Sequence, residues 1–149
     1  MKTTAVISMG CGLALALFAL AAGRDGAAEE NAANKPFDPA DVVALAVYSG
    51  DPDKGYQDIR GLKAEQVRFE VTDAAAIAAA LAAIDLEHPL HAKLAMLPHA
   101  VVFLKFKDGA VRKAHLLDDY RYFDLVGDPF YTYRVRSREP LAKLARTLP

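Results

Sequence analysis

Three of the four histidines in this chain stand close together in a polar stretch. His88, His91 and His99 supply imidazole nitrogens, which bind divalent transition metals, and a neighbouring carboxylate or Met96 could complete a zinc or copper site. The spacing matches no established metal motif, because Pro89 separates the first two histidines and disrupts a shared helical face. A solvated connection between two elements would carry the same residue types. Metal binding is therefore the alternative hypothesis, and the identity of any cofactor stays open.

Aromatic and basic residues are concentrated between positions 120 and 138. Strand alternation would place Tyr131, Tyr133 and Val135 on one face and the arginines on the other. Arginine forks bind carboxylates, and tyrosines are favoured at interfaces, so this strand could contact an acidic protein or another anionic partner. The competing interpretation is a core aromatic cluster beside the wet side of a strand. The predicted partner-binding residues are Tyr120, Tyr122, Tyr131, Tyr133, Arg134, Arg136 and Arg138.

The residues that common enzymes need are largely missing after position 23. Ser49 and Ser137 are the only serines there, and neither lies in a G-x-S-x-G sequence. Cysteine is absent from the same region, and no glycine-rich phosphate-binding motif occurs. We therefore expect a non-enzymatic protein with no assigned catalytic residue, although a site built on histidine, tyrosine or carboxylates remains open.

The first 23 residues have the pattern of a secretory signal peptide. Lys2 precedes a long uncharged, apolar run, and small residues spaced as A-x-A end at Ala21 or Gly23. Uncleaved, the run would be near the lower length limit of a membrane-spanning helix, which is the alternative. We expect cleavage, a periplasmic or secreted location and no stable membrane span afterwards. The remaining chain would carry a net charge of about −2, which excludes a bulk polycation and disfavours a nucleic-acid partner.

Cys11 could carry a lipid only if it ended the apolar run of a lipoprotein signal. The apolar core follows Cys11 instead, so we expect it to leave with the signal peptide. In that case the mature chain forms no disulfide. Residues 24–35 lack aromatic residues and an apolar period, and are expected to be a flexible leader to a single domain over 36–149.

The hydrophobic periods of the domain predict alternating strands and helices. Residues 42–48 form an apolar run typical of a strand buried on both faces, and residues 67–71 alternate as a half-exposed strand would. Asp73 is expected to cap a helix that continues to about Asp85. Asp108-Gly109 predicts a tight hairpin between strands 101–107 and 111–117.

The C-terminal third is expected to hold one more strand and one more helix. Residues 130–136 alternate strictly, and residues 140–148 place leucines on one helical face, while 118–129 show no clear period. The resulting order is ββαβββα. We predict an α+β fold with a mostly antiparallel sheet of about five strands and two helices on one face. The function predicted from these observations is that of a small exported binding module.

Overall fold

The computed structural model of this chain describes residues 35–128 and 132–148, and the structural statements below concern these residues. The signal peptide, most of the leader and Tyr131 therefore lie outside the described residues. In the described part, no helix has the length and apolar character needed to cross a membrane.

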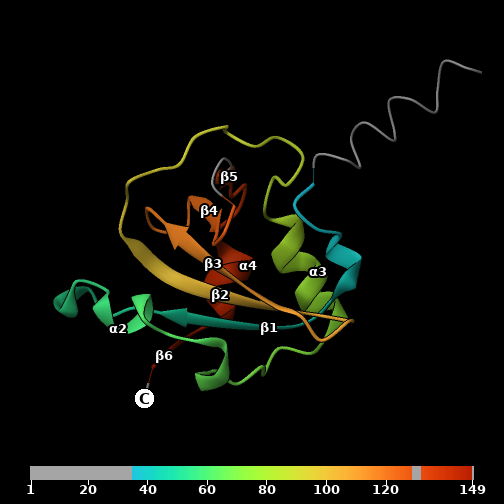
Figure 1. The fold of residues 1–149 in the computed structure, drawn as a ribbon, viewed down its shortest axis with the longest axis horizontal. Coiled ribbons are helices and arrows are strands. Elements are labelled where there is room, and N and C mark those ends of the chain that lie inside the picture. The colour runs from blue at the N-terminus through green and yellow to red at the C-terminus, as the bar shows by residue number, and fades with distance from the viewer. Residues whose placement is uncertain (1–34, 129–131, 149) are drawn as a thin grey trace, which may run out of the picture. The chain divides into compact units, whose positions relative to one another are not determined.

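A six-stranded sheet forms the centre of the domain, with strand order β5-β4-β3-β2-β1-β6 (Figure 1). All neighbouring strands are antiparallel except β1 and β6, which pair in parallel. The α+β class and the mostly antiparallel sheet are thus confirmed, with six strands where about five were expected. The strands are β1 (Val42–Ser49), β2 (Pro98–Phe106), β3 (Val111–Leu117), β4 (Tyr122–Leu125), β5 (Thr132–Arg134) and β6 (Ala145–Thr147).

Two helices, α3 (Ala74–Ala82) and α4 (Glu139–Leu144), contribute to one core with the sheet, as expected. We call the side of the sheet that they cover the helix face. Leu81 and Leu141 from the helices join Leu104 and Phe123 from the strands in this core. Asp73 caps α3 as predicted, because its carboxylate accepts the amide of Ala76 at 2.8 Å.

The opposite side, here called the outer face, is covered only in part. The short helices η2 (Pro52–Lys54), α2 (Gln57–Arg60) and η3 (Ala64–Gln66) follow β1, and η1 (Pro39–Asp41) precedes it. Ile59 of α2 packs on Val101 and Phe103 in a second, smaller core. Alternation along β1 serves both cores, which is why its residues are apolar at nearly every position.

Two sequence expectations were wrong in detail, and one strand was not predicted. Residues 67–71 form no strand, because only Val71 bridges to Leu45 while Val67 and Phe69 pack on the second core. Residues 118–129 contain β4, whose four residues are too few to show a period. The C-terminal helix ends at Leu144, and residues 145–147 pair with β1 instead.

The hairpin between β2 and β3 forms at Asp108-Gly109 as predicted. Gly109 has a φ of 86°, which glycine adopts without steric cost. The edge strand β5 is not left open in the described structure. Asp85 and Leu90, from the segment after α3, donate backbone hydrogen bonds to Arg134 and Thr132.

Candidate functional site

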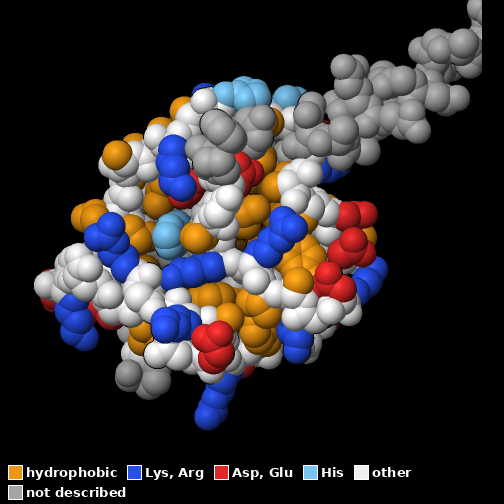
Figure 2. All heavy atoms as spheres, viewed as in Figure 1, with side chains coloured by type: hydrophobic (Ala, Val, Ile, Leu, Met, Phe, Trp, Pro, Cys, Tyr) orange, Lys and Arg blue, Asp and Glu red, His pale blue; other side chains and the backbone are white. Residues whose placement is uncertain are grey.

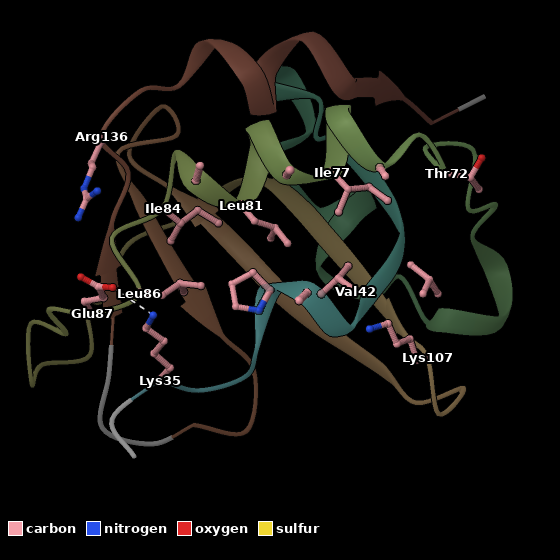
Figure 3. Close-up of a pocket in the computed structure, with 16 residues that line it drawn as sticks. Lys35, Val42, Thr72, Ile77, Leu81, Ile84, Leu86, Glu87, Lys107 and Arg136 are labelled. Carbon is pink, nitrogen blue, oxygen red and sulfur yellow. Dashed lines mark ion pairs between the residues drawn. The ribbon is translucent and has the colours of Figure 1, made fainter. Parts of the chain in front are cut away.

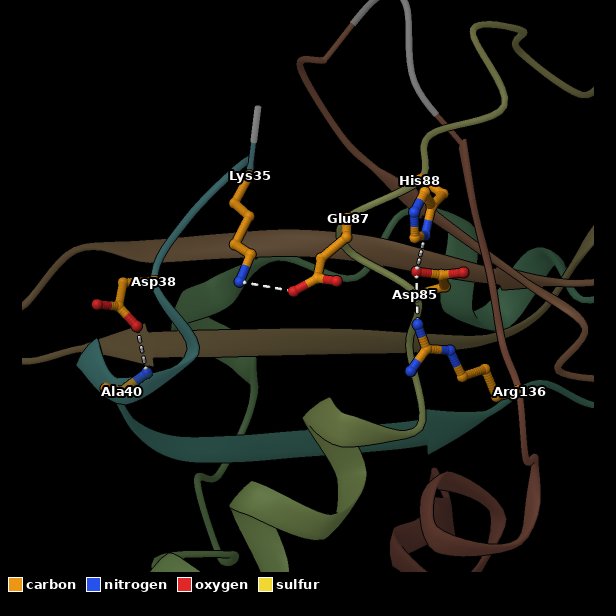
Figure 4. Close-up of polar contacts among 7 residues, drawn as sticks. All are labelled: Lys35, Asp38, Ala40, Asp85, Glu87, His88 and Arg136. Carbon is orange, nitrogen blue, oxygen red and sulfur yellow. Dashed lines mark hydrogen bonds and ion pairs between the residues drawn. The ribbon is translucent and has the colours of Figure 1, made fainter. Parts of the chain in front are cut away.

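The three histidines that are close in the sequence have different neighbours in the structure. His88 contacts Asp85 through Nδ1 at 2.9 Å, and Asp85 also accepts a hydrogen bond from Arg136 at 2.8 Å (Figure 4). His91 is exposed on a backbone with a φ of 49°, and His99 stacks on Tyr56 with ring centroids 4.6 Å apart.

No group of three or more His, Cys, Asp or Glu side chains could hold a metal ion in the part of the chain that the structure describes. The metal alternative thus receives no support from the arrangement of His88, His91 and His99. The acidic partner of His88 is already engaged. Burial acts to raise the pKa of Asp85, but hydrogen bonds from His88 and Arg136 outweigh it, and the pKa is lowered.

The predicted aromatic surface is largely core. Tyr133 is fully buried between the sheet and the helices, where its ring lies 6.4 Å from that of Phe123. Tyr120 is buried in the same core, and its hydroxyl shares a hydrogen bond with Ser49 at 2.7 Å. Burial raises the pKa of Tyr120. These two tyrosines therefore stabilise the fold.

The three arginines of the predicted stripe do not form one row. The regular alternation stops at Val135, which bridges to Ile84, so the chain bends before Arg136. Arg136 is paired with Asp85, and Arg138 is paired with Asp119. Arg134 alone of the three stands in a strand.

Arg134 and Tyr122 are cross-strand neighbours on the outer face. They are paired in the register of β5 and β4, next to the row that joins His115, Asp124 and Thr132 across three strands. Arg134 is exposed and Tyr122 is half-buried. Two of the predicted partner-binding residues are thus adjacent, in a place where the sheet meets solvent.

Other basic side chains lie on the same face of the sheet. Lys113 extends from β3, lies 5.7 Å from the Phe103 ring centroid and donates hydrogen bonds to the backbone carbonyls of Arg60 and Leu62. Figure 2 shows Lys and Arg side chains spread among hydrophobic ones over the middle of the molecule. We define the basic patch as Arg60, Lys93, Lys105, Lys113 and Arg134.

His115 lies beside this patch and responds to its charge. Burial is the main reason that the pKa of His115 falls to about 4, and the positive charges of Lys113, Lys93 and Arg60 lower it further. The imidazole is therefore neutral at pH 7. The lowered pKa is thus a second indication, besides their place in the fold, that Lys113, Lys93 and Arg60 lie near His115.

Asp124 is the carboxylate next to His115 in the sheet. It is 5% exposed, and its Oδ2 lies 3.9 Å from the Nζ of Lys93. Burial raises the pKa of Asp124. The Nε2 of His115, which is paired with Asp124 in the register of β3 and β4, is buried without a hydrogen-bond partner. The single carboxylate of Asp124 cannot balance the charges of all the basic residues in the patch.

Sequence reasoning missed Lys93, Lys113 and His115 as members of a common site. The alternation of Lys113 and His115 with the buried Ala114 and Leu116 was a usable signal for two of them. Lys93 lies in an irregular segment, so only the folded chain shows that it reaches Asp124.

Comparisons with known proteins add no family to this picture. No protein-family model, no curated protein and no solved structure matches the chain. The function must therefore be inferred from the surface itself.

Proposed function

We propose that this domain is a non-enzymatic binding module for an acidic protein partner and that the basic patch is its binding surface. The observation that carries the proposal is the convergence of three basic residues on His115, on the outer face. They are Arg60, Lys93 and Lys113, and the same face of the sheet carries Lys105 and the Tyr122–Arg134 pair. Arg60, Lys105 and Arg134 take part in no ion pair among the described residues, so their charges are available to a partner.

The chemistry of the patch suits carboxylate groups on an extended or loop segment. Arginine offers a planar pair of donors, and lysine offers a mobile charge, so together they accommodate acidic side chains at varied spacing. Tyr122 adds a half-buried ring with a polar tip, a residue type that is enriched at binding interfaces. Lys105 lies over the Phe69 ring at 5.8 Å, which restrains its position.

An exported location is part of this proposal and is supported by the pattern of the first 23 residues, which is that of a secretory signal. The partner would accordingly belong to the cell envelope or the extracellular space. A metal-dependent activity is not proposed, because its three histidines do not converge.

Titration with a glutamate-rich peptide, followed by NMR, tests the proposal. The amides of β3, β4 and β5 should shift, and Lys93→Glu with Arg134→Glu should weaken binding by about tenfold. Two exposed charge contacts of up to about 1 kcal/mol each account for that factor. Raising the salt concentration should weaken binding further.

A matched variant carries the same charge change elsewhere. Lys54→Glu with Lys143→Glu changes two exposed lysines of η2 and α4 that are not members of the patch, and should leave peptide affinity within about twofold of wild type. Equal affinity of the two double variants would refute the proposed surface. Binding to vesicles that contain anionic lipid is measured separately. Tighter binding to these vesicles than to the peptide would contradict an acidic protein partner and indicate a membrane surface instead.

A further inference from the structure

A groove of about 830 Å³ lies between α3 and η1 (Figure 3). It lies on the helix face of the sheet, whereas the basic patch lies on the outer face. Its volume is within the range of about 300–1,000 Å³ that small-molecule sites occupy. Val42, Ile77, Leu81, Ile84 and Leu86 form an apolar floor and are each less than 8% exposed.

Small side chains on α3 create this space. Ala74, Ala78 and Ala82 recur every fourth residue, so they line one side of the helix and the groove. A larger residue at any of these positions would fill the gap between the helix and η1. Val43 completes the wall and is 40% exposed, which is high for a valine in a strand of a packed sheet.

Charged groups at the rim favour an anionic occupant. Lys35, Lys107 and Arg136 line the groove, whereas Glu87 is the only carboxylate among its described lining residues. Lys107 stands at one end of the groove, and Arg136, Lys35 and Glu87 stand at the other.

Lys107 and Lys35 pair with carboxylates that are more than half exposed, whereas Arg136 pairs with Asp85, which is 19% exposed. Lys107 pairs with Asp41 at 3.3 Å, and the two side chains are 61% and 54% exposed. Such exposed pairs contribute little to stability, so a ligand anion can compete for the ammonium group. Lys35 pairs with Glu87 at 3.1 Å, and these two side chains are 34% and 53% exposed.

We infer that the groove binds an amphiphile with one unbranched apolar chain and a single anionic head group, such as a medium-chain carboxylate. The chain would lie along the alanine side of α3, over the apolar floor. The carboxylate would contact Lys107 or Arg136 at an end of the groove. This inference is independent of the proposed acidic partner, because it uses different residues on a different surface.

Calorimetric titration of the full chain with decanoate tests the inference. Ala78→Trp fills the groove and should weaken binding by at least about tenfold, since losing burial of two methylene groups already has that effect. Ala75→Trp, at an exposed position of the same helix that does not line the groove, should bind as wild type does. Ala78→Leu is a milder filling variant if the tryptophan impairs folding.

The head group is tested separately with uncharged 1-decanol. Wild type should bind decanoate more tightly than 1-decanol, and Lys107→Gln with Arg136→Gln should remove about fivefold of decanoate affinity without affecting the alcohol. Equal affinity for both ligands would overturn the anionic preference. Absence of decanoate binding to wild type would overturn the ligand site. So would an Ala78→Trp variant that binds decanoate as wild type does and differs only in its oligomeric state, measured by sedimentation.

Discussion

His115 stays neutral in the folded domain at pH values where a free imidazole is largely protonated. Its pKa is lowered to about 4, so between pH 6.5 and 4 the unfolded chain binds a proton that the folded chain does not. The stability linked to this residue is therefore complete above pH 6.5 and is lost as the pH falls toward 4.

Replacing His115 with glutamine should flatten this part of the pH profile. Thermal unfolding measured from pH 7 to pH 4 should show a smaller fall in Tm for His115→Gln than for wild type. Gly61→Ala, which changes no titratable group, should follow the shape of the wild-type curve. An equally steep fall for His115→Gln would contradict the burial of a neutral His115 beside basic groups.

At the scale of single elements, the turn that follows β1 requires a glycine at position 50. A Cβ atom at this position would lie 2.7 Å from the Tyr56 Cδ1 and 2.8 Å from the Ile59 Cδ1. Ile59 is fully buried in the second core, so it has little freedom to move. The close approach of β1 to α2 thus requires a residue without a side chain.

Gly50→Ala should lower the free energy of unfolding by about 1–3 kcal/mol, the usual cost of overpacking a core. Gly61→Ala is the matched control, because a Cβ there meets no atom within 4 Å and the φ of −83° suits alanine. That variant should be unchanged or slightly more stable. Urea denaturation of both variants measures the difference, and equal stabilities would contradict the proposed close packing.

Elements with a strong local signal were predictable, and elements defined by pairing were not. The capped helix after Asp73 and the hairpin at Asp108-Gly109 carry their own turn and cap chemistry. In contrast, residues 67–71 alternate as a strand does but find no continuous partner, because α2 and η3 bring them onto the second core. Pairing with β1 similarly ends the last helix at Leu144.

Stability should be unevenly distributed at the scale of the whole molecule. β2 lies between two long antiparallel neighbours, while β6 contributes three residues at the edge and pairs only with β1. Hydrogen exchange should therefore show the slowest amides in β1 and β2, limited by global unfolding, and faster local opening in β6. Protection of β6 equal to that of β2 would show that the C-terminus is integral to the cooperative unit.

Charged residues are unevenly distributed over the molecule, and the net charge does not show this. The formal net charge of the chain is only −1, yet the outer face gathers Arg60, Lys93 and Lys113 around His115. A partner-binding surface at this place stays a prediction. Of the residues predicted for it, Tyr122 and Arg134 lie side by side in the sheet.

The sequence by itself determined the α+β class, the capped helix, the hairpin and an abundance of arginine and tyrosine near the C-terminus. These features depend on short-range periodicity and on local backbone preferences. Only the tertiary structure decided that Tyr120 and Tyr133 are core and that Lys93 reaches Asp124. It alone revealed the alanine-walled groove. Such features depend on which distant strands pair and on which face each side chain consequently points to, and local sequence does not specify either.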